Sequence, residues 1–357
     1  MSEILSLNDI YDTKVQIEKV KTLSSDSQGK NSTVFIGKDM QMEKEFLIKQ
    51  IKKEHLRQHT SDIFEEAKLL SKSSHRNIMP LQYSSYDEDF IYMAIPYFKN
   101  GSLDKFVNCF SSNQKLIEYC LDFLSGLAHA HVLGILHLDI KPSNVVIDDS
   151  DRALLTDFGQ SHILGDYESV SFSKPIYTLN YSPNILVNGE VCVDDDIYQV
   201  GLMLYRIFNN FYYQESINNL KVNNTNNIQL AQLILEQKFP SNNFMPHIPT
   251  KIRNIIKKCL GRSKENYHSI IEVMNDMARV DKQLDVGYEY NSESETIKWK
   301  KRTKSAIIST ELDLNLNKVT AKKEVLATGN IQNVNKLNKS FTSRKDAFGA
   351  IKSHLEE

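Results

Sequence analysis

The chain has 357 residues, of which 41% are hydrophobic and 25% are charged. This length gives a prior of about two domains, and the composition is ordinary for a globular protein, so a wholly disordered or fibrous chain is excluded. The 43 Lys and Arg residues against 45 Asp and Glu residues give a net charge of -2. Nothing in this overall charge indicates a protein that coats nucleic acid or a polybasic membrane binder.

The N-terminus and the cysteines indicate a cytoplasmic protein. No stretch approaches 18 consecutive apolar residues, so we expect no membrane-spanning helix, and the first residues lack the pattern of a secretory signal. The cysteines Cys109, Cys120, Cys192 and Cys259 are scattered and form no C-x-x-C pair. We therefore expect reduced thiols, with neither a zinc site nor a disulfide framework.

Residues 15–100 are predicted to be mainly strands with one helix. Short apolar runs at 34–36, 46–48 and 90–95 are bounded by polar turns, which is typical of buried strands. Between Ser61 and Ser74, apolar residues recur at the spacing of an amphipathic helix that Ser61 would cap.

The chain beyond Gly101 is predicted to be mainly helical. Apolar-rich stretches predict helices over 116–133, 197–211 and 248–260. A β-rich half followed by an α-rich half indicates an α+β fold with two lobes.

The last part of the chain is predicted to be a small module of strands and a helix. The polar segment 287–295 indicates a linker before it. Leu312, Leu314 and Leu316 alternate with polar residues, as in a half-buried strand. Ser343 with Asp346 resembles a capping box that opens a helix.

The module also contains the basic run Trp299-Lys300-Lys301-Arg302. We interpret it as a strand with a buried Trp and a solvated lysine face. The alternative is a site for nucleic acid or an acidic partner, although the run lacks the interleaved aromatic residues of a nucleic-acid surface.

Two polar motifs in the middle of the chain carry the chemistry. The first is the stretch His137-Leu138-Asp139-Ile140-Lys141-Pro142-Ser143-Asn144, and the second, Asp157-Phe158-Gly159, follows a short apolar run. A carboxylate that accepts a proton, beside an amide and a carboxylate that hold Mg²⁺, is what phosphoryl transfer requires.

These motifs resemble those of the eukaryotic-type protein kinase family, H-R-D-x-K-x-x-N and D-F-G, in the same order. The resemblance implies a two-lobed kinase fold, ATP as the nucleotide and Mg²⁺ as its metal. It implies that Asp139 and Lys141 are catalytic and that Asn144 and Asp157 bind the metal and, with it, ATP. A lysine at the position of Lys141 implies a Ser or Thr acceptor.

The resemblance extends upstream to a lysine and a glutamate. Lys49 ends the apolar run 46–48 and matches the strand lysine that holds the ATP phosphates. Glu66 matches the helix glutamate that pairs with it, so both residues are assigned to the catalytic set.

The remaining ATP-binding residues follow from the same resemblance. Gly29 is the middle glycine of the phosphate-covering loop, whose other glycines are replaced here, and Val34 follows it. Ile95 matches the gatekeeper position. Pro96 and Phe98 match the hinge, whose backbone meets adenine, and proline suits a position where only a carbonyl is needed.

Two departures from the family pattern affect regulation. Leu138 replaces the arginine that, in the family, receives a phosphate of the activation segment, which implies a kinase that is not switched by that contact. Asn184 and Tyr267 replace a Glu–Arg pair, and we expect these two residues to be neighbours.

We therefore expect a serine/threonine protein kinase with a protein substrate, no membrane association and no nucleic-acid partner. The expected domains are a lead-in over 1–14, a kinase domain over 15–280 with lobes over 15–98 and 99–280, a linker over 281–295 and a module over 296–357. One alternative is a pseudokinase scaffold, which the poor glycine loop favours. The other gives the C-terminal module a protein- or nucleic-acid-binding role.

Overall fold

The computed structural model describes residues 15–23, 32–56, 65–107, 111–165, 167–172 and 178–356. The chain divides into two compact units, one from residues 1–72 and 79–97 and the other from residues 73–78 and 98–357. The first is rich in strands and the second in helices, so the predicted α+β fold with two lobes is confirmed. The lead-in over 1–14 and Gly29 lie outside the described residues.

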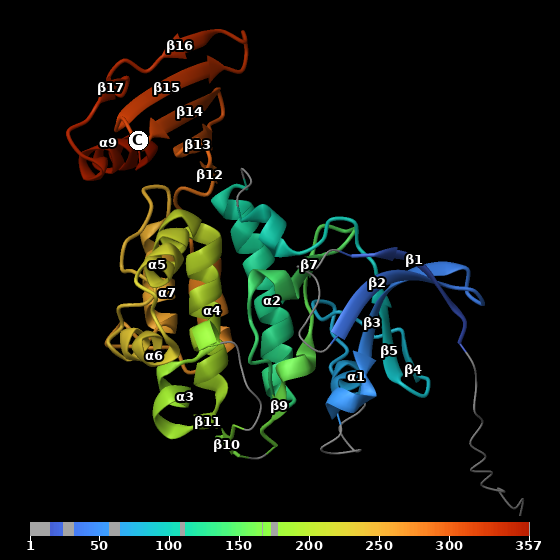
Figure 1. Ribbon diagram of the computed structural model, residues 1–357. Coiled ribbons are helices and arrows are strands. Elements are labelled where there is room, and N and C mark those ends of the chain that lie inside the picture. The colour runs from blue at the N-terminus through green and yellow to red at the C-terminus, as the bar shows by residue number, and fades with distance from the viewer. Residues whose placement is uncertain are drawn as a thin grey trace, which may run out of the picture. The chain divides into compact units, whose positions relative to one another are not determined.

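The first unit is an antiparallel sheet with one helix. The strands follow the order β1-β2-β3-β5-β4. Their bounds are β1 Ile17–Thr22, β2 Ser32–Asp39, β3 Lys44–Lys52, β4 Tyr83–Tyr86 and β5 Phe90–Pro96, and helix α1 spans Glu65–Lys72 (Figure 1). Phe35, Phe46, Ile48 and Ala94 form a buried cluster, so the apolar runs predicted as strands supply this core.

Helices are the main regular structure in the second unit. They are α2 Asn113–Val132, α3 Pro183–Asn188, α4 Val193–Phe208, α5 Asn210–Val222, α6 Asn227–Leu235, α7 Thr250–Cys259 and α8 Ile270–Ala278. Helix α4 contacts α2, α5 and α7, and it is buried along almost its whole length. It is therefore the central helix of this unit.

The helix predicted over 197–211 is two helices that meet at Asn209. The buried Asn209 side chain accepts a hydrogen bond from the Met245 N–H at 3.0 Å and donates one to the Asn243 carbonyl at 2.8 Å. Its amide thus binds a distant loop, and the polypeptide changes direction there.

Short strand pairs frame the loops of the second unit. They are β6 Ile135–Leu136 with β9 His162–Ile163, β7 Val145–Ile147 with β8 Ala153–Leu155, and β10 Val170–Ser171 with β11 Glu190–Val191. They bring residues 137–144 and 156–159 back to the same region of the unit.

The C-terminal module is a six-stranded antiparallel sheet with a helix. The bounds are β12 Val286–Asn291, β13 Thr296–Arg302, β14 Ala306–Asp313, β15 Lys318–Val325, β16 Ile331–Asn333, β17 Lys339–Ser340 and α9 Arg344–Glu356 (Figure 1). One face of the sheet is buried through Ile297, Trp299, Leu312 and Val319. The Trp299 ring lies 6.3 Å from that of Phe348 of α9, measured between centroids.

The predicted linker over 281–295 is wrong in its middle part, because β12 occupies residues 286–291 and pairs with β13. Its apolar residues Val286, Tyr288 and Tyr290 alternate, but the polar residues between them obscure this pattern. The Tyr288 hydroxyl oxygen accepts a hydrogen bond from the Phe211 N–H at 3.0 Å. The module therefore packs on the helices of its own unit.

The predicted strand through Leu312, Leu314 and Leu316 ends earlier than expected. Strand β14 stops at Asp313, whose Oδ1 accepts hydrogen bonds at 2.9 Å from the N–H groups of Asn315 and Leu316. This turn leaves Leu316 64% exposed, while Leu312 and Leu314 are buried. No helix in the described part of the chain has the length and hydropathy needed to span a membrane.

Candidate active site

The loop that carries Asp139 is attached to helix α4 through Asp196. The buried Asp196 carboxylate accepts hydrogen bonds from the N–H groups of His137 and Leu138, each at 2.8 Å, and lies 2.8 Å from Nε2 of His131. Burial alone would raise the pKa of Asp196, but the hydrogen bond and charge of His131, the charge of His137 and its amide outweigh burial and lower it. An ionised carboxylate thus fixes the start of the loop.

A second α4 side chain, Gln199, binds both N–H and C=O groups of the backbone. Its Oε1 accepts from the Ile140 N–H at 2.9 Å, and its Nε2 donates to the carbonyls of Leu138 at 3.0 Å and Asn180 at 3.2 Å. The support matters because Leu138 has a φ of 59°, in the left-handed region that strains a bulky residue.

The Asp139 carboxylate is held by three side chains. Its Oδ2 accepts from Nζ of Lys141 at 2.7 Å and from Nδ2 of Asn144 at 2.8 Å. Its Oδ1 accepts from Nδ2 of Asn180 at 3.0 Å. Asp139 is only 7% exposed, so the structure brings the predicted residues Asp139, Lys141 and Asn144 together around one nearly buried carboxylate.

Asn144 and Asp157 lie on adjoining segments. The Thr156 N–H donates to the Asn144 carbonyl at 2.9 Å, which places the residue before Asp157 beside Asn144. The amide nitrogen of Asn144 donates to both the carbonyl and the carboxylate of Asp139. The Asn144 side chain can therefore bind a cation through its amide oxygen, Oδ1. Asp157 has a φ of 63° and lies two residues after β8, directly before the short 3-10 helix Phe158–Gln160. An amide oxygen and a carboxylate form a donor set that suits Mg²⁺.

The first unit gathers some of the predicted ATP-binding residues on one face of its sheet. Val34 of β2 and Met93 of β5 both pair with Lys49 of β3, and Leu47 pairs with Ile95. Directly paired residues share a face, and so do residues two apart, so Val34, Lys49 and Ile95 lie on the same face. Lys49 is half-buried there.

The other predicted residues are placed less completely. Glu66 lies in α1, but its side chain is outside the described residues. Pro96 ends β5 and pairs with Phe46. Phe98 follows in the second unit, where its carbonyl accepts from the Gly101 N–H at 3.2 Å.

Comparison with known proteins identifies the family. The model of the protein kinase domain matches residues 25–277, well over half of the chain. The chain belongs to the protein kinase family. It is 26% identical over 186 residues to rat 3-phosphoinositide-dependent protein kinase 1, covering 50% of this chain and 33% of that protein.

Other curated kinases are similar to the chain at a comparable level. A probable serine/threonine-protein kinase PknB from Lactococcus lactis is 25% identical over 218 residues, covering 60% of this chain and 34% of that protein. A probable serine/threonine-protein kinase from Dictyostelium discoideum is 23% identical over 252 residues, covering 70% of this chain and 38% of that protein. The chain spans about a third of the length of these relatives.

Within this kinase fold, the leucine that replaces the family arginine is part of an apolar cluster. Leu138 is fully buried with Leu136, Leu164, Ile185 and Val191. Val170, Phe172 and Tyr181 pack against the same cluster. Apolar packing therefore connects the catalytic loop to the described parts of the segment that follows the D-F-G motif.

The two residues that replace the family Glu–Arg pair each have a partner of their own. Nδ2 of Asn184 donates to Oδ2 of Asp195 at 3.0 Å, whereas the Tyr267 hydroxyl donates to Asp276 at 2.7 Å. Ser182 also donates to Asp195. The segment is thus bound to α4 through a buried aspartate of this chain.

Asn180, Asp195 and Gln199 were missed by the sequence reasoning, although each contacts the loop or the segment beside it. The available signal was the spacing of Asp195, Asp196 and Gln199 on a helix that is otherwise apolar. Gln199 follows Asp196 by three positions and Asp195 by four, so it lies beside both on the helix, and a buried polar group needs a partner.

Proposed function

We propose that the chain is a serine/threonine protein kinase that transfers the γ-phosphoryl group of ATP to a Ser or Thr hydroxyl of a protein. The observation that carries this proposal is the Asp139 carboxylate, oriented by Lys141, Asn144 and Asn180 in a nearly buried loop. The curated relatives named as serine/threonine kinases support the choice of acceptor.

The hydrogen bonds at Asp139 distinguish its two oxygens. Oδ2 accepts from the Lys141 ammonium and the Asn144 amide, whereas in the described part of the chain Oδ1 accepts from the neutral Asn180 amide alone. The two donors to Oδ2 occupy both of its lone pairs, so Oδ1 keeps the capacity to accept a hydrogen bond from a substrate hydroxyl. Asp139 would orient the substrate hydroxyl and take its proton on this atom, and Lys141 would face the transferring group.

Asn144 and Asp157 would hold Mg²⁺, which when bound neutralises charge on the ATP phosphates. Lys49, paired with Glu66, would position these phosphates. The remaining proposed ATP contacts are Gly29, Val34, Ile95, Pro96 and Phe98. Cytoplasmic action fits Cys120, Cys192 and Cys259, which are free cysteines.

We also propose that activity does not depend on a phosphorylated activation segment. Leu138 offers no charge to a phosphate, and it is buried in the apolar cluster to which Val170 and Phe172 contribute. Packing in this cluster would hold the activation segment in place, as an Arg–phosphate pair does in other kinases.

The test is phosphoryl transfer by the purified chain with labelled ATP and Mg²⁺, followed by mapping of phosphosites by mass spectrometry. Asp157→Asn removes a proposed metal ligand and Lys49→Ala removes the phosphate clamp, so each is expected to abolish transfer while far-UV circular dichroism stays unchanged. Lys44→Ala, an exposed lysine on the same strand, is the matched control and is expected to keep wild-type activity. Transfer that survives in the Asp157 or Lys49 variant would refute the kinase assignment, and nucleotide binding without transfer by the wild type would favour a pseudokinase scaffold.

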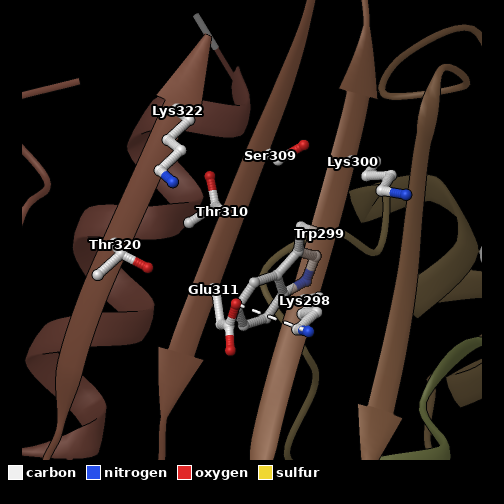
Figure 2. Close-up of a pocket in the computed structure, with 8 residues that line it drawn as sticks. All are labelled: Lys298, Trp299, Lys300, Ser309, Thr310, Glu311, Thr320 and Lys322. Carbon is white, nitrogen blue, oxygen red and sulfur yellow. Dashed lines mark ion pairs between the residues drawn. The ribbon is translucent and has the colours of Figure 1, made fainter. Parts of the chain in front are cut away.

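A second candidate function concerns the C-terminal module, which has a pocket of about 140 Å³ on its sheet. Figure 2 shows Lys298, Lys300 and Lys322 around Ser309, which pairs directly with Lys300 and Lys322. Glu311 lies 3.7 Å from Lys298, and three lysines against one glutamate make the charged residues of the lining mainly basic. We propose that this surface binds an acidic protein, and the alternative ligand is nucleic acid. Binding of RNA, DNA and an acidic peptide at two salt concentrations, with a Lys300→Glu/Lys322→Glu variant, would separate them.

A further inference from the structure

A small pocket lies directly beside the candidate catalytic carboxylate. It measures about 50 Å³, and Lys141 and Asn180 form part of its wall. Both residues also donate to Asp139, at 2.7 and 3.0 Å. A group bound in this pocket would therefore be separated from the proposed site of phosphorylation by a single side chain.

The size and apolar wall of the pocket suit one amino-acid side chain. Pockets for small-molecule ligands usually measure roughly 300–1,000 Å³, several times this volume. Leu179, Met203 and Phe239 contribute apolar surface to the wall. Such a pocket can hold a side chain that has a short apolar stem and a polar end group, which would contact the polar residues of the wall.

The charged side chains of the pocket wall are both cationic. Lys141 and Arg206 line it, and none of the described lining residues is acidic. Arg206 donates through Nη2 to Asp104 at 2.6 Å, and its guanidinium carbon lies 5.5 Å from the centroid of the Tyr213 ring. Asp104 stands outside the pocket and is 33% exposed on its side chain, so its charge is partly screened.

Arg206 has hydrogen-bonding capacity that Asp104 does not use. An arginine has five N–H donors, and the Nε–H of Arg206 is buried with no acceptor in the described part of the chain. A buried donor without an acceptor is unfavourable, so an anion that lets the guanidinium reorient towards the pocket gains a charge-assisted hydrogen bond.

We propose that this pocket binds an acidic side chain of the protein substrate, close in sequence to the phosphorylated Ser or Thr, and that Arg206 selects it. This inference rests on the proposed kinase function and adds a substrate class to it. The ligand chemistry is a single anionic group on a short stem, which Asp, Glu and phosphoserine all offer.

The experiment compares peptides that differ at one residue. A peptide with one acceptor serine and otherwise neutral residues is the reference, and one Asp, Glu or phosphoserine is placed at each position from four before to four after the serine. At the best position, we expect kcat/KM to rise about tenfold over the reference, mainly through a lower KM, because the acidic side chain binds before the transfer step. The Asp and phosphoserine peptides show which anion the pocket prefers.

Three variants separate recognition from a structural role. Arg206→Leu should bring the acidic-to-neutral ratio of kcat/KM close to one, and Arg206→Lys should retain part of it. Asp104→Asn removes the competing carboxylate and should increase the ratio. A purely structural Asp104–Arg206 pair would instead make Arg206→Leu and Asp104→Asn lower kcat/KM equally for every peptide, which would overturn the inference.

Peptide binding, measured in parallel by fluorescence anisotropy, separates this inference from the kinase assignment. Acidic preference in binding that Arg206→Leu removes, without any phosphoryl transfer, would leave the pocket assigned and refute the kinase. Transfer to acidic and neutral peptides with equal kcat/KM at every position would refute the pocket and leave the kinase. Absence of peptide binding would also refute the pocket.

Discussion

Replacing Trp299 by Phe tests how strongly the C-terminal module is bound to the helices of its unit. Nε1 of Trp299 donates to Nδ1 of His247 at 3.2 Å, and both side chains are almost fully buried. The other ring nitrogen of His247, Nε2, lies 3.1 Å from the Phe208 carbonyl at the end of α4. The substitution leaves the Nδ1 acceptor buried without its donor.

The expected loss follows from that unpaired acceptor. A buried polar group left without a partner costs about 1–3 kcal/mol, and the smaller ring adds roughly 1 kcal/mol of lost packing. We expect Trp299→Phe to lower the free energy of unfolding by about 2–4 kcal/mol at pH 8. Tyr167→Phe, at an aromatic residue that is 74% exposed, is the control and should change it by less than about 0.5 kcal/mol.

The loss should also depend on pH, because burial lowers the pKa of His247 to about 3. The unfolded imidazole has a pKa of about 6.5, so the unfolded state binds the proton first and wild-type stability falls from pH 6.5 towards 3, by at most about 1.4 kcal/mol per pH unit. In Trp299→Phe, Nδ1 has no donor and protonates more easily, which raises the pKa in the folded state. The difference between the two proteins should therefore shrink as the pH falls from 7 to 5.

Urea unfolding at pH 8, 7, 6 and 5, followed by circular dichroism, measures this difference. Intrinsic tryptophan fluorescence is unsuitable, because Trp299 is the single Trp of the chain. Two results would refute the idea that the Trp299–His247 hydrogen bond holds the module on the helices. One is equal stability of Trp299→Phe and wild type at pH 8, and the other is a difference in stability that stays constant down to pH 5.

The remaining predictions concern the helical unit and its regulation. Gly126→Ala, in α2, places a Cβ against the backbone oxygen of Asn77, which is fixed by the Leu155 N–H at 2.9 Å. Although Ala favours a helix by about 1 kcal/mol over Gly, we expect a net loss of about 1–3 kcal/mol in urea unfolding, and a gain in stability would show that the two segments are not in contact. Phosphatase-treated protein should phosphorylate its substrate without a lag, and a lag that disappears after incubation with ATP would show that a phosphate is required despite Leu138.

Local patterns in the sequence predicted the elements that depend on near neighbours. The helix expected over 116–133 is α2 at Asn113–Val132, and the strand expected over 90–95 is β5. The predicted helix start at Ser343 is confirmed, since α9 begins at Arg344 and Ser343 Oγ accepts from the Asp346 N–H at 3.2 Å and donates to its Oδ2 at 2.7 Å. Apolar periodicity and capping act within a few residues, so they can be read without the fold.

The features that were not predicted depend on contacts between distant residues. Asn180 reaches Asp139 across 41 positions, and Arg206 reaches Asp104 across 102 positions. Strand β12 has a weak pattern of its own and is stabilised by pairing with β13 and by the helices that it covers. Family motifs supplied Asp139, Lys141 and Asn144, but not the side chains that hold them in place.

The attachment of the catalytic loop to α4 has a consequence for hydrogen exchange. The amide hydrogens of His137, Leu138 and Ile140 lie outside helices and strands, yet all three are donated to buried side chains of one helix. Their exchange with deuterium then requires that the loop separates from α4, a sub-global opening rather than a loop fluctuation. These amides should therefore exchange as slowly as those in the middle of α4, and the loop and the helix should open as one cooperative element.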